Sequence, residues 1–250
     1  MAFCELKYTS PSLQKMIACN ILLPETDSPG PFPVLYLLHG QSDDHTAWCR
    51  KSAIERHVSG KNLVVVMPDT GRGWYIDAEK GPKWESSIMV DLMGYIEKMF
   101  PVIPDRKGRS IAGLSMGGYG AFKLALKFPD KFCAAVSLSG AVGFGNFELA
   151  KANNSDWEKE MMLIVGDSPT GGPHDLYKLL KDLPVSQRPA LAFNTGVDDF
   201  LLDQNRQMHA YLNDIGYKHI YEEHPGAHTW EYWDTHIVDA LKFFNEYIQF

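Results

Sequence analysis

The chain has 250 residues, of which 45% are hydrophobic, and its formal net charge is −7. This size and content predict one α/β domain over residues 1–250 with a full hydrophobic core. Its Lys and Arg residues are scattered, which argues against a nucleic-acid partner and against binding to a membrane surface of anionic lipid, since both need a basic face.

Strands and helices alternate along the chain. In its first half we predict strands over Lys15–Leu23 and Val34–Leu38, a helix over Ala47–Val58, a strand over Leu63–Met67, a helix over Trp84–Phe100 and a strand over Arg109–Leu114. In its second half we predict a helix over Gly117–Phe128, strands over Phe132–Leu138 and Met161–Val165, a helix over Asp175–Asp182, a strand over Ala190–Asn194, a helix over Leu202–Ile215, a strand over Lys218–Glu223 and a closing helix over Glu231–Ile248. The strands are short apolar runs, and the helices show apolar residues at helical spacing.

This alternation predicts an α/β fold with a mostly parallel central sheet of about eight strands and helices on both faces. In such sheets the functional loops follow the carboxyl ends of the strands, so the site residues are expected there. Residues 140–157, which include Phe147, Asn153 and Asn154, are too short for a large cap domain but long enough for a small lid over the site.

The segment Gly113-Leu114-Ser115-Met116-Gly117 matches the G-x-S-x-G motif and stands between a predicted strand and a predicted helix. In this motif the serine occupies a sharp, strained turn, and the flanking glycines avoid collisions with neighbouring chain. The turn exposes the hydroxyl and directs the Met116 amide at developing negative charge. We therefore expect Ser115 to be a nucleophile; a purely structural glycine-rich turn is the alternative.

A second backbone donor for an oxyanion is expected in the loop after Val34–Leu38, which begins His39-Gly40-Gln41-Ser42. Gly40 allows a sharp turn with the amides facing inward. We assign the donor to the Gln41 amide, with the Ser42 amide as the alternate. His39 precedes the serine, whereas in folds that carry a G-x-S-x-G turn of this kind the catalytic residues follow the order serine, acid, histidine. We therefore expect His39 to brace the loop.

The acid and the base are expected after the last strands. Asp198 and Asp199 both follow a late strand, and chemistry alone does not separate them; the one that is not catalytic is expected to cap the next helix. His228 follows the turn pair Pro225-Gly226 and precedes the closing helix, so its ring can reach the serine. His224 is expected to pack within the strand. The acid would hold the imidazole tautomer and stabilise its cationic form.

Together these segments resemble the esterase D, tributyrin-esterase and feruloyl-esterase group of α/β-hydrolases and, more distantly, the antigen 85 mycolyltransferases. The resemblance covers nearly the whole chain and rests on Leu37-Leu38-His39-Gly40 with Trp48, on residues 113–121, on Asp199-Phe200-Leu201, and on residues 225–230 with Trp233. It implies an α/β-hydrolase fold, Asp199 as the acid, oxyanion amides at Gln41 and Met116, no cofactor, and a homo-oligomer in some members.

The resemblance also implies a small-molecule or carbohydrate ester as substrate, with a short acyl, acetyl or feruloyl group. We therefore predict a serine carboxylesterase that acts through an acyl-serine intermediate. The alternatives are an acyltransferase with the same triad, a thioesterase similar to S-formylglutathione hydrolase, and a non-catalytic binding module on this scaffold. The thioesterase ranks lower because that branch is longer around its substrate loops and differs after the oxyanion strand.

Aromatic residues near the expected site are candidates for substrate contact. Trp74 and Tyr75 follow the strand Leu63–Met67, and Trp230 lies beside His228; for each the alternative is burial in the core. No metal is expected, because His224 and His228 are the one histidine pair four apart, and Pro225-Gly226 prevents the helix that such a pair needs. The N-terminus lacks a signal-peptide pattern, which makes the cytoplasm the default expectation, although a chain trimmed of its leader would look the same.

Overall fold

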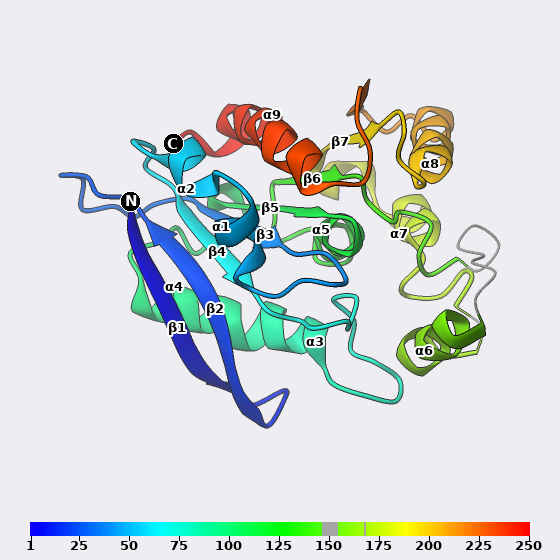
Figure 1. Cartoon of the computed structure of the whole chain (residues 1–250), viewed down its shortest axis with the longest axis horizontal. Coiled ribbons are helices and arrows are strands. Elements are labelled where there is room, and N and C mark those ends of the chain that lie inside the picture. The colour runs from blue at the N-terminus through cyan, green and yellow to red at the C-terminus, as the bar shows by residue number, and fades with distance from the viewer. Residues whose placement is uncertain (147–154, 168) are drawn as a thin grey trace.

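The computed structural model of the chain describes residues 1–146, 155–167 and 169–250. Its strands form one sheet in the order β1-β2-β4-β3-β5-β6-β7-β8. Their bounds are β1 Ala2–Ser10, β2 Lys15–Leu23, β3 Val34–Leu38, β4 Val64–Pro68, β5 Arg109–Leu114, β6 Ala134–Leu138, β7 Ala190–Gly196 and β8 His219–His224. β1 pairs antiparallel with β2, and β2 with β4, whereas all other neighbours are parallel (Figure 1). The predicted mostly parallel sheet is confirmed.

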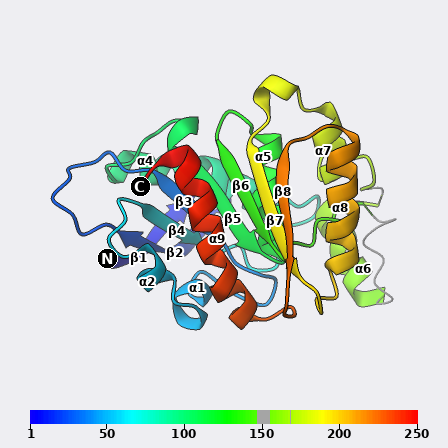
Figure 2. The ribbon, with the colours of Figure 1, turned by 90° about the horizontal axis from the view of Figure 1, so that it is seen from above.

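Helices cover both faces of this sheet, as predicted. Their bounds are α1 Ala47–Lys51, α2 Ile54–Val58, α3 Trp84–Ser86, the π-helical turn η1 Ser87–Leu92, α4 Met93–Met99, α5 Met116–Lys127, α6 Ser155–Val165, α7 Leu176–Asp182, α8 Leu202–Asp214 and α9 Trp230–Ile248, with short 3₁₀ turns η2 Arg106–Gly108 and η3 Val185–Gln187. One core lies beneath α1, α2 and α9, and the other beneath α3–α5, α7 and α8; Figure 2 shows α9 crossing the first face. Within the described ranges, no helix has the length and apolar content needed to cross a membrane.

Three elements differ from the prediction. The predicted strand Met161–Val165 is wrong: these residues end α6, with Met161 and Ile164 buried and the intervening Met162 and Leu163 exposed. A short apolar run does not itself separate a strand from a helix, and here the packing follows helical spacing. The place of that strand in the sheet count is taken by β1, which the prediction missed. Its sequence signal was the alternation of Cys4, Leu6 and Tyr8 with charged residues. In the structure these three are less exposed than the residues between them.

The predicted helix Ala47–Val58 is divided into α1 and α2. Ser52 between them is extended, with φ −133° and ψ 174°. The break leaves the Ala53 N–H free of helical bonding, and it donates to Asp234 Oδ1 on α9 at 2.7 Å. The division therefore ties this edge of the fold to α9. Of the small lid expected from the sequence, residues 147–154 lie outside the described residues.

Glycines permit a very close approach where β5 passes into α5. A Cβ atom on Gly113 would lie 2.3 Å from the Gly117 carbonyl oxygen, and one on Gly117 would lie 2.6 Å from the His39 carbonyl oxygen. Real Cβ atoms do not approach backbone oxygens this closely, so only glycine fits at either position. The start of α5 is thereby packed directly against the end of β3.

We predict that Gly113→Ala lowers the free energy of unfolding by at least about 2 kcal/mol, because the new methyl group collides with rigid backbone. The matched control is Gly94→Ala on α4, an exposed helical position where nothing lies within 4 Å of the added Cβ. That variant should gain up to about 1 kcal/mol through higher helix propensity. Urea denaturation followed by circular dichroism measures both, and equal stability of the two variants would contradict the packing argument.

Candidate active site

Ser115 joins β5 to α5 in a strained backbone conformation. Its φ is 52° and its ψ is −117°, a region that costs a non-glycine residue about 1–3 kcal/mol and that surrounding structure must enforce. The Ser115 amide donates to the Leu138 carbonyl at 2.9 Å, and its carbonyl accepts from the Ala141 amide at 3.1 Å. These bonds to β6 and the loop after it hold the serine at the carboxyl edge of the sheet, half-buried.

The imidazole of His228 bridges Ser115 and Asp199. Its Nε2 lies 2.9 Å from Ser115 Oγ, and its Nδ1 lies 2.8 Å from Asp199 Oδ2. An ionised carboxylate accepts hydrogen bonds and cannot donate them, so Nδ1 carries the imidazole proton and Nε2 accepts from the serine hydroxyl. In this tautomer Nε2 is in position to take the hydroxyl proton.

Parallel pairing of β7 with β8 brings the aspartate and histidine loops together. Gly196 pairs with His224 at the strand ends, and beyond them the Asp198 amide donates to the Gly226 carbonyl at 2.9 Å. Asp199 points inward, with its side chain fully buried, whereas Asp198 is exposed. The structure therefore separates the two aspartates that the sequence left open.

The expected helix cap is not found at Asp198, and that prediction is wrong. α8 has Leu201 as its N-cap residue, with no side-chain cap bond. Asp199 instead accepts from the Leu201 amide through Oδ1 at 2.8 Å while Oδ2 faces His228. One carboxylate thus holds both the start of the next helix and the histidine, which fixes its orientation.

His39 fixes the loop after β3, as expected. The ring is buried, its Nε2 accepts from the Thr70 amide at 3.1 Å, and its Nδ1 lies 2.7 Å from the Gly40 carbonyl oxygen. Because a backbone N–H can only donate, Nδ1 must carry the proton and donate to Gly40. The Gly40 carbonyl and the Gln41 N–H belong to one trans peptide and point in opposite directions. The hydrogen bond from His39 to Gly40 therefore directs the Gln41 N–H away from the imidazole ring of His39.

Two backbone amides near Ser115 are free to bind an anion. Met116 is the first residue of α5, so its N–H has no partner within the helix. Neither the Met116 nor the Gln41 amide has a hydrogen-bond partner elsewhere among residues 1–146, 155–167 and 169–250. Tyr75 supports the loop from below, because its hydroxyl donates to the His39 carbonyl at 2.8 Å. Both N–H groups can therefore donate to an anion that lies beside Ser115.

A cavity of about 530 Å³ opens over Ser115 and His228. Its lining combines polar side chains with three aromatic ones: Gln41, Asp43, Lys51, Arg72 and Glu231, then Phe200, Trp230 and Trp233. Phe200 was not among the residues predicted to contact a substrate. It is 75% exposed, and its ring lies 4.6 Å from that of His228. The available sequence signal was an aromatic residue directly after the predicted acid.

The predicted aromatic contacts divide between cavity and core. Trp230 lines the cavity, with its ring edge-on to Trp48 at 5.2 Å and Lys51 Nζ 5.4 Å above it. Trp74 and Tyr75 are 4% and 0% exposed and are not among the described lining residues. Both adopt positive φ angles, of 51° and 58°, and this turns them beneath the loop into the core.

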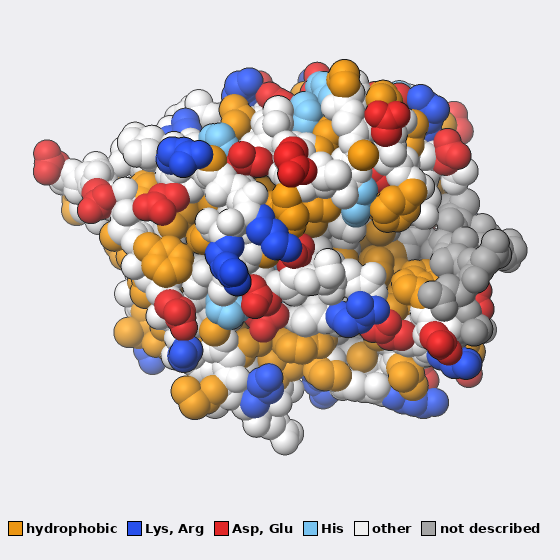
Figure 3. Space-filling model, in the orientation of Figure 1, with side chains coloured by type: hydrophobic (Ala, Val, Ile, Leu, Met, Phe, Trp, Pro, Cys, Tyr) orange, Lys and Arg blue, Asp and Glu red, His pale blue; other side chains and the backbone are white. Residues whose placement is uncertain are grey.

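The charges that line the cavity are largely paired. Lys51 Nζ lies 2.8 Å from Asp43, and Arg72 binds Glu160 through two hydrogen bonds of 2.7 and 2.6 Å. The hydrogen bond from Arg72 holds the pKa of Glu160 below its ordinary value, so this pair stays ionised at neutral pH. Positive and negative side chains are also interspersed over the face of the molecule that Figure 3 shows.

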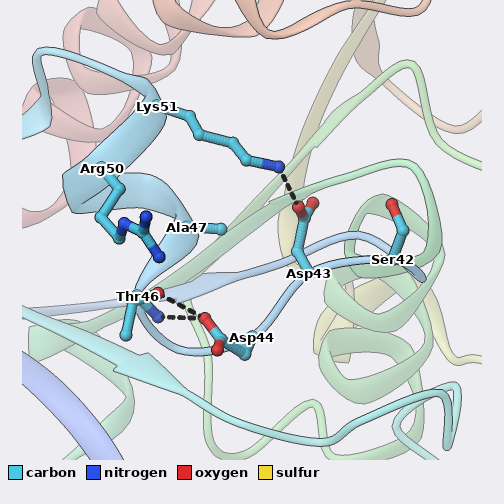
Figure 4. A pocket seen from close by; sticks show the side chains of 7 residues that line it. All are labelled: Ser42, Asp43, Asp44, Thr46, Ala47, Arg50 and Lys51. Carbon is cyan, nitrogen blue, oxygen red and sulfur yellow. Dashed lines mark hydrogen bonds and ion pairs between the residues drawn. The ribbon is translucent and has the colours of Figure 1, made fainter.

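A second hollow, of about 330 Å³, adjoins the cavity and shares Ser42, Asp43 and Lys51 with it. Figure 4 shows Arg50 and Lys51 entering it from α1, with Lys51 directed at Asp43. The Asp44 carboxylate accepts hydrogen bonds from the Thr46 amide and hydroxyl, at 2.8 and 2.6 Å. Arg50 is exposed and forms no ion pair within the described part of the chain.

Comparison with known proteins agrees with this arrangement. The Esterase family model, described as "Putative esterase", matches residues 10–244. An acetyl esterase of Caldicellulosiruptor saccharolyticus is 26% identical, over 98% of this chain and 99% of its own length. FphF of Staphylococcus aureus, a fluorophosphonate-binding serine hydrolase, is 33% identical with a TM-score of 0.89, over 97% of this chain and 98% of that one.

Two further solved structures have TM-scores of 0.85. An S-formylglutathione hydrolase (FrmB) of Staphylococcus aureus is 32% identical, over 97% of this chain and 98% of that one. A ferulic acid esterase is 26% identical, over 99% of this chain and 98% of that one. The resemblance predicted from the sequence is confirmed. The chain belongs to the Esterase family and is a serine carboxylic ester hydrolase of the α/β-hydrolase fold.

Proposed function

We propose that Ser115, His228 and Asp199 are the nucleophile, the base and the acid of this esterase, within one catalytic domain. The observation that carries the proposal is the bridging imidazole of His228, with 2.9 Å to the hydroxyl on one side and 2.8 Å to the buried carboxylate on the other. Hydrogen-bond contact among these three groups is what activates a serine that is otherwise a weak nucleophile.

The proposed reaction follows from this geometry. Ser115 Oγ attacks the ester carbonyl carbon as His228 Nε2 takes its proton, and the oxyanion accepts from the Met116 and Gln41 amides. Collapse of this intermediate breaks the ester bond, and His228 gives its proton to the departing alcohol. Water, deprotonated by His228, then attacks the acyl-serine and releases the acid and the free enzyme.

We propose short acyl groups on a polar alcohol, such as an acetylated sugar, as the substrate class. The mixed lining supports this. The paired charges and the side-chain amide of Gln41 can hydrogen-bond to hydroxyl groups, while Trp230 offers a fixed aromatic surface. The buried Gln41 Nε2 has no hydrogen-bond partner among the described residues and remains available to such a substrate. The names of the acetyl esterase and ferulic acid esterase relatives are consistent with this class.

A thioester with an anionic leaving group is the second candidate. The unpaired guanidinium of Arg50 favours it, since it stands in a hollow that adjoins the cavity (Figure 4). The S-formylglutathione hydrolase among the similar structures has a substrate of this chemistry by its name. Asp43 does not oppose it, because Lys51 neutralises its charge, whereas Asp44 is held by neutral Thr46 groups and keeps a negative charge that Arg50 must outweigh.

We predict that Ser115→Ala lowers kcat for p-nitrophenyl acetate by about 10⁴-fold or more while the circular dichroism spectrum is unchanged. Ser139→Ala is the matched control, because Ser139 also has a positive φ, of 45°, and follows the adjacent strand β6. Its Oγ has no hydrogen-bond partner in the described ranges, so its removal should leave turnover near the wild-type rate. Wild-type-like turnover by Ser115→Ala would refute the assignment.

We predict that His39→Leu lowers kcat about 100-fold with little change in KM, because the Gln41 amide loses its fixed direction. His39→Asn should recover much of this loss, since Asn Nδ2 occupies nearly the position of histidine Nδ1 and can donate to Gly40. The rate at which a fluorophosphonate labels Ser115 should follow the same order, and thermal melting of each variant separates this effect from misfolding. Equal rates for the two variants would show that the donor to Gly40 is irrelevant.

The two substrate classes are separated by Arg50→Ala. We expect kcat/KM for S-formylglutathione to fall about fivefold, the size expected for an exposed ion pair, and that for p-nitrophenyl acetate to stay constant. Acetylated xylo-oligosaccharide serves as the uncharged comparison. A stronger wild-type preference for the oligosaccharide supports the first candidate, whereas an equal loss on all three substrates would contradict the proposed role of Arg50.

A further inference from the structure

Two histidines and an aspartate meet where the end of β8 packs against α9, away from the proposed triad. His224 is the last residue of β8, and His236 and Asp239 are three residues apart on α9. One ligand atom from each lies within 4.8 Å of those of the other two. Across the described ranges, this is the one group of three or more His, Cys, Asp or Glu residues with such spacing.

His224, one of the three residues, has an unsatisfied ring nitrogen. Its Nε2 is buried and has no hydrogen-bond partner among the described residues. Glu222 Oε2 lies 3.6 Å away, which is too long for a hydrogen bond. A buried polar atom without a partner in the protein calls for an explanation, and a bound ion is one such explanation.

The spacing between His236 and Asp239 suits a tetrahedral ion. Zinc bonds of 2.0–2.1 Å to nitrogen and oxygen place neighbouring ligand atoms about 3.4 Å apart. His236 Nδ1 and Asp239 Oδ2, which a hydrogen bond now joins, are 3.0 Å apart, and the ligand atoms of all three residues lie within 4.8 Å of one another. Asp239 also lines a hollow of about 220 Å³, so an ion can reach its carboxylate from solvent.

We propose that His224, His236 and Asp239 bind a zinc-class divalent ion, with water as the fourth ligand. Two imidazoles favour zinc and its neighbours over magnesium or calcium, which prefer oxygen ligands alone. The sequence pattern points away from a metal because it pairs His224 with His228 across Pro225-Gly226. In the folded chain the ring of His224 instead stacks on that of His236.

Binding requires one local movement. The rings of His224 and His236 are stacked, with centroids 4.2 Å apart and planes inclined by 16°, whereas an imidazole binds a metal in the plane of its ring. One ring must therefore turn about χ2, a torsion with broad preferences. The His224 side chain is 28% exposed and has the freedom to turn, so we assign the movement to it.

The site would join the two elements that flank the His228 loop. β8 ends at His224 and α9 begins at Trp230, so an ion shared by His224 and α9 closes the loop between them. Lys242 opposes binding, because its Nζ lies 3.0 Å from Asp239 Oδ1 and places a positive charge beside the ion. Its side chain is 73% exposed, so it can leave without breaking other packing.

The test is a zinc titration of the full chain after treatment with EDTA. We expect the Tm to rise by about 5 °C when free Zn²⁺ exceeds its Kd a hundredfold. Co²⁺ should give the visible absorption bands of a tetrahedral site with nitrogen ligands. His236→Gln and Asp239→Asn should each weaken zinc binding, measured by calorimetry, by at least about 100-fold, while hydrolysis of p-nitrophenyl acetate by the zinc-free variants stays unchanged.

Two further variants make the test specific. Lys242→Ala should bind zinc a few-fold more tightly, because a competing charge is removed. His209→Gln should keep the full response, although it removes the other close histidine pair, in which His209 Nδ1 lies 2.8 Å from His219 Nε2. The proposal is overturned if millimolar Zn²⁺ leaves the Tm unchanged, if His236→Gln responds like the wild type, or if His209→Gln abolishes the response.

Discussion

The close approach of α5 to the ends of β3 and β5 is the constraint on which the rest of the site depends. Glycine at positions 113 and 117 removes the Cβ atoms that would meet backbone oxygens at 2.3 and 2.6 Å. The helix can then begin directly after Ser115, whose φ of 52° is held by hydrogen bonds to the neighbouring chain. The same contact brings the start of α5 against the loop after β3. One packing event therefore sets both the exposed hydroxyl and the two free amides, which is why strain is tolerated there.

Parallel strand order brings the remaining groups to that point. β5, β6, β7 and β8 are neighbours in the sheet and end at the same edge, so loops from distant parts of the chain converge there. Asp199 and His228 come from the loops after β7 and β8, and bonds between these loops, such as that from the Asp198 amide to the Gly226 carbonyl, keep them in register. The 2.8 Å contact between His228 and Asp199 thus rests on backbone pairing and not on the two side chains alone.

What the sequence could predict depends on whether the signal was local. Ser115 and His228 stand in turns whose glycines and proline mark their positions, and both lie where expected. Asp198 and Asp199 have the same chemistry, and the direction of each side chain is decided by the pairing of β7 with β8. Trp74 and Tyr75 were equally ambiguous, because their burial follows from two successive positive φ angles that bulky residues rarely adopt. The run Met161–Val165 misled because five apolar residues fit a buried strand and the end of a helix equally well.

The histidines show most clearly why side-chain roles require the folded chain. His39 receives an N–H bond on Nε2, which forces its proton onto Nδ1 and makes it a brace for the loop after β3. His228 faces a buried carboxylate through Nδ1, so its Nε2 is left basic beside a hydroxyl. His224 has an Nε2 with no partner among the described residues, which leaves it available to an ion. These rings are chemically identical. Neighbours distant in sequence, namely the Thr70 amide, the Asp199 carboxylate and the α9 residues, decide the role that we propose for each: support of a loop, catalysis or metal binding.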